Sequence, residues 1–364
     1  MRIIKVGTDF SGIGSPEAAL TELKNEGFLN FESEFSCEID KFARLSHKQL
    51  HKSKVFYEDI TKRNHSEVPK LDLYVAGFPC QAFSIAGKQK GFEDVRGTLF
   101  FNVADFIREN QPETFILENV KGLLSHDKGR TFQTIIDLLS NGGGTVNGQM
   151  SLDYCSDGLG YHIHFQVLNT KEHGIPQNRE RIFIVGFKKS RDYSFPIAET
   201  LNLRLKDLLE TEVDEKYFLS DKTLKGLLKG QSTPQFTDGN DIARCFTAGG
   251  NSGGMHSSMT LIGAMRGRNP KDPKSRKSGL ETKQMLEINE NGTSNCLTSV
   301  QKDNLVVTNR IRRLTPLECW RLQGFSDSDF YKAKKVNSDT QLYKQAGNSI
   351  SVRVIKKIIK NIYK

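Results

Sequence analysis

The stretch Gly77-Phe78-Pro79-Cys80-Gln81-Ala82-Phe83-Ser84 directly follows an apolar run at residues 71–76. That run has the length and composition of a β-strand, and Pro79, which lacks an N–H group, cannot continue a central strand. We therefore expect Cys80 at the carboxyl end of a strand, where open α/β sheets bind their ligands. Residues 82–97 are polar and rich in Gly and Lys, which predicts a long functional loop. Taken alone, Cys80 is either a catalytic nucleophile or an ordinary buried cysteine.

The totals for the chain indicate the class of protein. Its 364 residues exceed one ordinary hydrophobic core, so we expect two domains. No apolar run has membrane-spanning length, and the N-terminus runs straight into a strand with no room for a signal peptide. The 6 cysteines form no C-x-x-C pair, which argues against disulfides and a metal site and fits a reducing cytoplasm. The formal charge of +9 fits nucleic-acid binding and a solvated basic surface equally well.

The N-terminal part has the pattern of a cofactor site. Residues 3–8 predict a strand, Asp9-Phe10-Ser11-Gly12-Ile13-Gly14 a tight glycine turn, and Ser15 the N-cap of a helix that ends at Gly27. A dinucleotide fingerprint needs a third glycine where Glu17 stands, beside the helix N-terminus that would hold pyrophosphate. A carboxylate there favours a cofactor without phosphate groups.

Acidic residues close three successive predicted strands, at Asp9, Glu38 and Asp59. Glu38 follows the glycine turn at about the spacing of an acid that binds ribose hydroxyls. Asp59 can accept a hydrogen bond from an adenine amino group while Ile60 covers the ring. Singly, each acid is explained as an ordinary strand-end or helix-cap residue. Together they favour an adenosine site, and S-adenosylmethionine fits best because it carries no phosphate and has a cationic sulfonium.

Further motifs extend this pattern along the chain. In order they are Phe10-x-Gly12-x-Gly14, Pro79-Cys80-Gln81, Glu118-Asn119-Val120, Gln177-x-Arg179-x-Arg181, residues 313–325 and residues 345–349. Through these six motifs the chain resembles the cytosine-C5-specific DNA methyltransferases of bacteria and phages over nearly its whole length.

The resemblance implies an α/β fold, in which an S-adenosylmethionine-dependent, Rossmann-like mixed sheet is flanked by helices and accompanied by a smaller irregular β-rich recognition domain. The catalytic and cofactor-binding domain would be discontinuous, at residues 1–189 plus 345–364. Residues 190–344 would form the target-recognition domain and hinge. The implied protein is cytoplasmic, nucleoid-associated and monomeric, acts on double-stranded DNA and does not bind membranes. It would belong to a restriction-modification system, with a restriction endonuclease as its functional partner.

The implied reaction is methyl transfer to C5 of a cytosine flipped out of a specific duplex site. C5 is a poor nucleophile. We therefore expect the thiolate of Cys80 to add to C6 first, which raises the electron density on C5. Glu118 would share a proton with N3, which requires burial to outweigh nearby arginine charge. Arg181, with Arg179 beside it, would hold O2 or fix the carboxylate, the alternative being phosphate contact or a plain ion pair. Flipping unstacks the base, and the loop after Cys80 would close over it.

The resemblance also implies the remaining site residues. Cofactor contacts would come from Asp9, Phe10, Gly12, Gly14, Glu38, Ile39, Asp59, Ile60, Leu99, Asn348 and Ser349. DNA contacts would come from Gln81, Ser84, Arg244, Asn251, Arg266 and Arg268, although a solvated loop explains the basic cluster around residues 266–277 equally well.

In residues 192–310 the alternation of strands and helices fades. A half-repeat appears there, since residues 243–248 recur as residues 294–299, and extended runs follow at residues 259–265 and 304–307.

One further segment departs from a compact α/β pattern, and another completes it. A Gly-rich insertion at residues 141–157 receives no role. Gly347-Asn348-Ser349-Ile350 is expected to open the final helix, with Val352, Ile355 and Ile359 on one face.

Two other functions remain open on the sequence. One branch of the family methylates transfer RNA, but the large segment at residues 192–310 favours DNA. A catalytically inert DNA-binding relative is the second alternative, and intact Cys80, Glu118 and Arg181 argue against it.

Overall fold

The computed structural model describes residues 3–79, 99–140, 158–220, 261–269, 281, 283–289, 294–295, 305–307 and 311–364. Several predicted site residues lie outside the described residues, as does the insertion at residues 141–157: Cys80, Gln81, Ser84, Arg244 and Asn251. No helix of the described segments is both long and apolar enough to cross a membrane.

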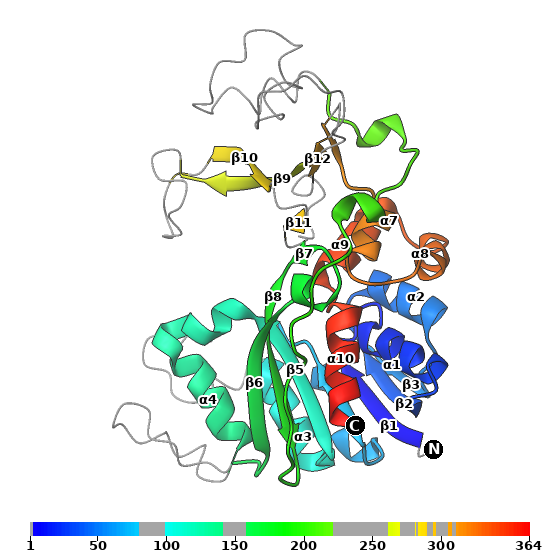
Figure 1. The fold of residues 1–364 in the computed structure, drawn as a ribbon. Coiled ribbons are helices and arrows are strands. Elements are labelled where there is room, and N and C mark those ends of the chain that lie inside the picture. Colours follow the sequence, from blue (N-terminus) through cyan, green and yellow to red (C-terminus); the bar gives the residue numbers. More distant parts are fainter. Residues whose placement is uncertain are drawn as a thin grey trace.

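A seven-stranded mixed sheet forms the centre of the fold, in the order β3-β2-β1-β4-β5-β8-β6 (Figure 1). The first five are parallel neighbours, and β8 runs antiparallel to both β5 and β6. Their bounds are β3 Val55–Tyr57, β2 Asn30–Cys37, β1 Ile3–Asp9, β4 Leu73–Ala76, β5 Thr114–Val120, β8 Glu180–Phe187 and β6 His162–Asn169. The predicted mixed α/β sheet is confirmed.

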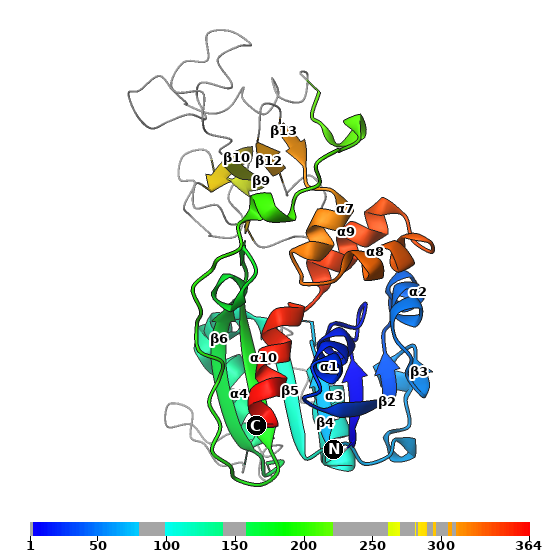
Figure 2. The same cartoon turned by 45° about the vertical axis from the view of Figure 1, so that its right-hand side comes forward.

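Helices cover both faces of this sheet because its central strands are apolar on both sides. On one face, α1 (Ser15–Asn25) packs against α10 (Val352–Ile362), and α2 (Lys41–Leu50) lies beside them. On the other face lie α3 (Leu99–Asn110) and α4 (Arg130–Leu139). Figure 2 shows α1 and α10 in front of the sheet with α3 and α4 behind it. Short 3₁₀ helices connect the strands: η1 Ile60–Lys62, η2 His65–Glu67, η4 Lys121–Gly129, η6 Thr170–His173, η7 Leu205–Leu208 and η8 Glu215–Tyr217.

The glycine turn differs in one detail from its prediction. The N-cap of α1 is Gly14, in the left-handed conformation with φ of 87°, and Ser15 is the first helical residue. Gly14 is required because a Cβ there would lie 2.2 Å from Cδ2 of His51 on the loop after α2. The prediction of Ser15 as the cap was therefore wrong. The predicted end at Gly27 is confirmed, since Gly27 has φ of 70° and the Phe28 amide donates to the Leu23 carbonyl at 2.9 Å.

The C-terminal part contains α7 (Pro316–Arg321), α8 (Asp327–Lys334) and α9 (Asp339–Asn348) before α10. Gly347-Asn348-Ser349 ends α9, and α10 begins at Val352 after the N-cap Ser351, so the prediction that this stretch opens the final helix was wrong. Val352, Ile355 and Ile359 are all buried, as predicted. The predicted domain boundary between residues 344 and 345 falls within α9, and buried residues of α7 to α9 share one core with α1 and α10.

A smaller antiparallel sheet has the order β10-β9-β12-β13 and lies at one end of the molecule (Figure 1). Its strands are β10 Lys283–Asn289, β9 Leu261–Arg268, β12 Leu305–Val307 and β13 Ile311–Arg313. The extended runs predicted after the half-repeat correspond to β9 and β12, which pair with each other. A parallel two-residue ladder joins β11 (Ser294–Asn295) to β7 (Gln177–Asn178), directly before β8.

Candidate active site

The segment that leads into Cys80 is held against the end of β5. Asn119 donates from its side-chain amide to the carbonyl oxygen of Phe78 at 3.0 Å. A Cβ on Gly77 would lie 3.5 Å from Oε2 of Glu118 and 3.3 Å from Cδ1 of Ile350. A side chain at this position would thus be in ordinary van der Waals contact with the Glu118 carboxylate, which places this segment of the chain directly beside the acid. Cys80 itself lies outside the described residues, two positions after Phe78.

Glu118 is a buried acid among the described residues of this site. It stands on β5 opposite Phe183 of β8, and 9% of its surface is exposed. Burial raises the pKa of Glu118, while the charges of Arg181 and Arg179 act in the opposite direction. Arg181 places Nε 3.1 Å from Oε1 of Glu118, forming an ion pair whose side chains are mostly buried.

Arg179 contacts the end of α9. Its guanidinium donates from Nη1 to the Gly347 carbonyl at 3.2 Å and from Nη2 to the Ser349 carbonyl at 2.8 Å. The residue is buried, and its charge also lowers the pKa of Glu118. Arg179 therefore connects the start of β8 with the Asn348–Ser349 motif, a link that sequence reasoning missed because the two segments are about 170 residues apart.

Glu38 stabilises the glycine turn. Its Oε2 accepts from the Gly12 amide at 2.9 Å, and its Oε1 accepts from the Asp40 amide at 2.8 Å. Burial raises the pKa of Glu38. Each carboxylate oxygen retains a second acceptor position, so Glu38 can still receive hydroxyl donors. The neighbouring Ile39 exposes 72% of its surface, an apolar side chain presented at the end of β2.

The backbone of the turn adopts rare conformations. Phe10 and Gly12 have φ of 52° and 55°. For Phe10 this left-handed conformation is uncommon, and such conformations gather at ligand sites.

Asp9 has a different environment from the one predicted. The prediction made it a cofactor contact, but both of its oxygens accept from Arg63, at 2.6 and 2.7 Å, and Oδ2 also accepts from the Tyr74 hydroxyl at 2.6 Å. The carboxylate is buried on the α3 side of the sheet. Neither Arg63 nor Tyr74 was among the predicted site residues.

The other predicted cofactor residues come from three segments. Asp59 is the N-cap of η1, where its Oδ1 accepts from the Thr61 amide at 2.9 Å, and Ile60 is buried. Leu99 is the first residue of α3. At the end of α9, Asn348 is exposed and Ser349 is buried. The strand order β3-β2-β1-β4 places the carboxyl ends that precede Asp59, Glu38 and the glycine turn side by side.

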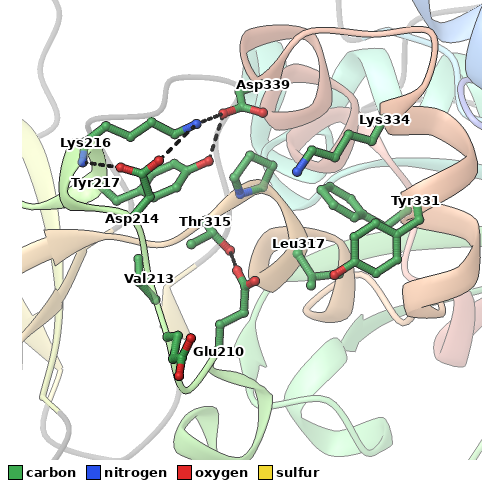
Figure 3. Close-up of a pocket in the computed structure, with 13 residues that line it drawn as sticks. Glu210, Val213, Asp214, Lys216, Tyr217, Thr315, Leu317, Tyr331, Lys334 and Asp339 are labelled. Atoms are coloured by element: carbon green, nitrogen blue, oxygen red, sulfur yellow. Dashed lines mark hydrogen bonds and ion pairs between the residues drawn. The ribbon is translucent and has the colours of Figure 1, made fainter.

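A separate cavity of about 180 Å³ lies between the segment 210–217 and helices α7 to α9 (Figure 3). Lys216 and the Tyr217 hydroxyl both reach Asp339, at 3.2 and 2.8 Å, and Thr315 contacts Glu210. None of the predicted catalytic or cofactor residues lines this cavity, so it is distinct from the candidate active site.

Comparison with known proteins identifies the family. Residues 5–364 match the family model described as C-5 cytosine-specific DNA methylase. The chain belongs to this family. It is a DNA cytosine methyltransferase, as the sequence motifs predicted.

Similar curated proteins support this assignment. The type II methyltransferase M.NgoBI of Neisseria gonorrhoeae is 38% identical, covering 95% of this chain and 89% of its own. The orphan methyltransferase M.SPRI of Bacillus phage SPR is 32% identical, covering 99% and 97%. Type II methyltransferase M.Bsp6I of a Bacillus strain is 34% identical, covering 100% and 99%.

Solved structures show the same fold. The S. pombe Dnmt2 methyltransferase has a TM-score of 0.65 at 18% identity, covering 98% of this chain and 97% of its own. A putative DNA modification methyltransferase encoded within an E. coli prophage has a TM-score of 0.57 at 21% identity, covering 99% and 98%.

Proposed function

We propose that this methylase forms a transient bond between Cys80 and C6 of a flipped cytosine in a specific duplex site, so that C5 can take a methyl group from S-adenosylmethionine. The observation that carries this proposal is the packing of Gly77 and Phe78 against Glu118 and Asn119. It brings the segment that enters Cys80 next to a buried acid with a raised pKa.

Glu118 would act as the proton donor to the cytosine ring. Addition at C6 moves negative charge onto N3 and O2, and a protonated carboxyl can donate to N3. Positioned acid–base catalysis of this kind contributes roughly 10²–10⁴-fold in rate. Arg181, in contact with Glu118, would orient the acid and face the charge that develops on O2.

The residues around the glycine turn fit S-adenosylmethionine. Glu38 has free acceptor positions for ribose hydroxyls, Ile39 presents an exposed apolar side chain, and Asp59 has an oxygen not used in capping Thr61. Glu17 is buried at the start of α1, where a diphosphate would be repelled. When bound, S-adenosylmethionine would supply a methyl group activated by its sulfonium charge. The chain's own residues would orient it and exclude water.

Domain organisation and partners form a further part of the proposal. Residues 1–189 together with the C-terminal helices would form the catalytic and cofactor-binding domain, and the sheet β10-β9-β12-β13 would belong to the recognition domain. Arg266 and Arg268 lie on β9 of that sheet, which suits contact with DNA phosphates or base edges. The chain would act as a monomer in the cytoplasm, paired functionally with a restriction endonuclease of the same specificity.

The test uses 5-fluorocytosine, whose C5 fluorine cannot leave as a proton does. Sequencing methylated cytosines in DNA from expressing cells first identifies the target. A duplex with 5-fluorocytosine at that position, incubated with enzyme and S-adenosylmethionine, should then give a covalent complex on a denaturing gel. Cys80→Ala should abolish the complex and keep DNA binding in a mobility-shift assay. A complex that persists in Cys80→Ala would contradict the assignment of the nucleophile.

A further inference from the structure

Arg63 is a buried guanidinium that joins two separate parts of the candidate cofactor site. Its Nη1 and Nη2 donate to the two oxygens of Asp9, and both side chains are 0% exposed. Asp9 is the last residue of β1 and directly precedes the glycine turn, whereas Arg63 directly follows η1. The ion pair therefore connects two segments that are 54 residues apart in sequence.

Aromatic rings restrict the guanidinium in this position. Cζ of Arg63 lies 4.4 Å from the ring centroids of both Phe35 and Phe106, and 5.5 Å from that of Tyr57. These rings come from β2, α3 and β3. A planar guanidinium stacks on rings and forms paired hydrogen bonds with a carboxylate at the same time, which an ammonium group cannot do. The orientation of Arg63 is thus fixed by three elements as well as by Asp9.

The Asp9 side chain is 0% exposed, so a ligand in the site does not reach its carboxylate directly. Arg63 and Tyr74 together make three hydrogen bonds to its carboxylate, which lies on the buried α3 side of the sheet. Its effect on a ligand must therefore pass through the elements that the ion pair connects. One of these is the glycine turn, whose Gly12 amide donates to Glu38, and the other is η1 with Asp59 and Ile60.

We infer that Arg63 is a positioning residue for the adenosine half of S-adenosylmethionine, an inference that rests on the proposed cofactor. By pairing with Asp9, Arg63 sets the spacing between the glycine turn, which would hold the ribose through Glu38, and Asp59–Ile60, which would hold the adenine. A ligand that contacts both segments binds more weakly when this spacing changes, because it can no longer make its best contacts with both segments at once.

The first experiment measures the Kd of S-adenosylhomocysteine by isothermal titration calorimetry, without DNA or turnover. Arg63→Lys keeps the positive charge and loses the paired geometry. We expect about a tenfold weaker Kd, a similar rise in the KM for S-adenosylmethionine, and a kcat within about twofold of the wild type.

Arg312→Lys is the matched control. Arg312 forms an equally buried paired contact with Glu318, at 2.8 Å for both bonds, and lies beside α7 away from the glycine turn. We expect this variant to lower the Tm to a similar extent and leave the Kd of S-adenosylhomocysteine within about twofold. Equal weakening in both variants would assign the effect to general destabilisation and overturn the inference.

A second variant distinguishes loss of the ion pair from a failure to fold. The double variant Asp9→Leu/Arg63→Met replaces the ion pair with hydrocarbon, a change that buried pairs often tolerate. It should fold and show the same loss of S-adenosylhomocysteine affinity, because the connection between β1 and η1 is gone. Wild-type affinity in this folded variant would overturn the positioning role.

A double-mutant cycle separates positioning from an independent structural effect. Asp59→Ala should weaken S-adenosylhomocysteine binding in the wild type and have little further effect in Arg63→Lys, because the two residues act on one adenine contact. Additive losses would contradict the inference. Failure of the wild-type chain to bind S-adenosylhomocysteine would instead overturn the cofactor assignment, so the two failures are distinguishable.

Discussion

The side-chain amide of Asn119 donates to the carbonyl oxygen of Phe78 at 3.0 Å and thereby ties the end of β5 to the segment that enters Cys80. Asn119 and Phe78 are both buried, so this bond is shielded from water. The bond fixes the direction in which the chain leaves β4.

Removing this bond should impair catalysis more than cofactor binding. Asn119→Ala leaves the Phe78 carbonyl without its hydrogen-bond donor, so the segment that leads into Cys80 can shift. A displacement of a reacting group by about 1 Å lowers the rate about 10²-fold. We expect kcat to fall by about that factor in steady-state methylation assays, with the Kd of S-adenosylhomocysteine unchanged.

Asn110→Ala provides a control at the other end of β4. Asn110 on α3 is also buried and donates to the Pro69 carbonyl at 2.9 Å. Its loss should lower the free energy of unfolding by about 1–3 kcal/mol without a comparable fall in kcat. A kcat as low as that of Asn119→Ala would show that the two bonds act only through stability.

Glu118 should make activity and stability depend on pH in the same direction. Because burial raises its pKa in the folded state above the ordinary value of 4.5, the unfolded state loses this proton at lower pH than the folded state does. The contribution of Glu118 to the free energy of unfolding is therefore full below pH 4.5 and is lost as the pH rises through the folded-state pKa. The protonated fraction that can donate to N3 falls over the same range.

Glu118→Gln removes this titration and keeps a hydrogen-bond donor. Its kcat should be roughly 10²–10⁴-fold lower, and the fall of kcat with rising pH should disappear. Urea unfolding at several pH values should show a smaller loss of stability with rising pH than the wild type. An unchanged pH profile of kcat would assign the titration to another group.

His47 and His51 should oppose this trend in acid. Burial lowers the pKa of each to about 4, so the unfolded state binds more protons than the folded state between about pH 6.5 and 4. Their stabilisation is full above pH 6.5 and is lost as the pH falls through 4, by up to about 1.4 kcal/mol per pH unit for each residue. His47→Gln should reduce this slope in urea unfolding, and a slope equal to that of the wild type would assign the loss of stability in acid to other groups.

The glycine turn offers a matched pair of substitutions. Gly14→Ala places a Cβ 2.2 Å from Cδ2 of His51 at a φ of 87°, so it combines steric overlap with backbone strain. Gly27→Ala adds a Cβ at φ of 70° with no atom within 4 Å, which isolates the backbone strain of about 1–2 kcal/mol. We expect Gly14→Ala to lower the Tm further and to weaken S-adenosylhomocysteine binding, and Gly27→Ala to leave binding unchanged. Equal binding in the two variants would argue against a ligand at the turn.

Local sequence signals predicted the strands of the central sheet that follow from apolar runs. The apolar runs predicted at residues 3–8 and 71–76 correspond to β1 and β4 to within two residues, because burial on both faces of a parallel sheet requires such runs. Glu118 was assigned from its motif; it is buried and its pKa is raised by that burial, while its place at the catalytic centre stays a prediction.

Relationships between distant residues were not accessible in the same way. Nothing near Asp9 in the sequence indicates that Arg63 and Tyr74 will bury its carboxylate, so a strand-end acid was interpreted as a ligand. Gly347 was expected to open the final helix, yet it lies in the last turn of α9, where the packing of buried Leu342, Tyr343 and Ala346 outweighs the low helical preference of glycine. The roles predicted for Cys80, Gln81 and Ser84 concern positions outside the described residues and stay predictions.

The ladder between β11 and β7 has a consequence for engineering new specificities. Ser294 and Asn295 pair through their backbones with Gln177 and Asn178, the residues directly before Arg179. A chimaera that imports the small sheet of a relative must therefore bring a two-residue extended segment in register with this pair. A graft that pairs one position out of register would displace β8, which carries Arg181. The hybrid would then lose turnover even where its grafted surface still binds the new target.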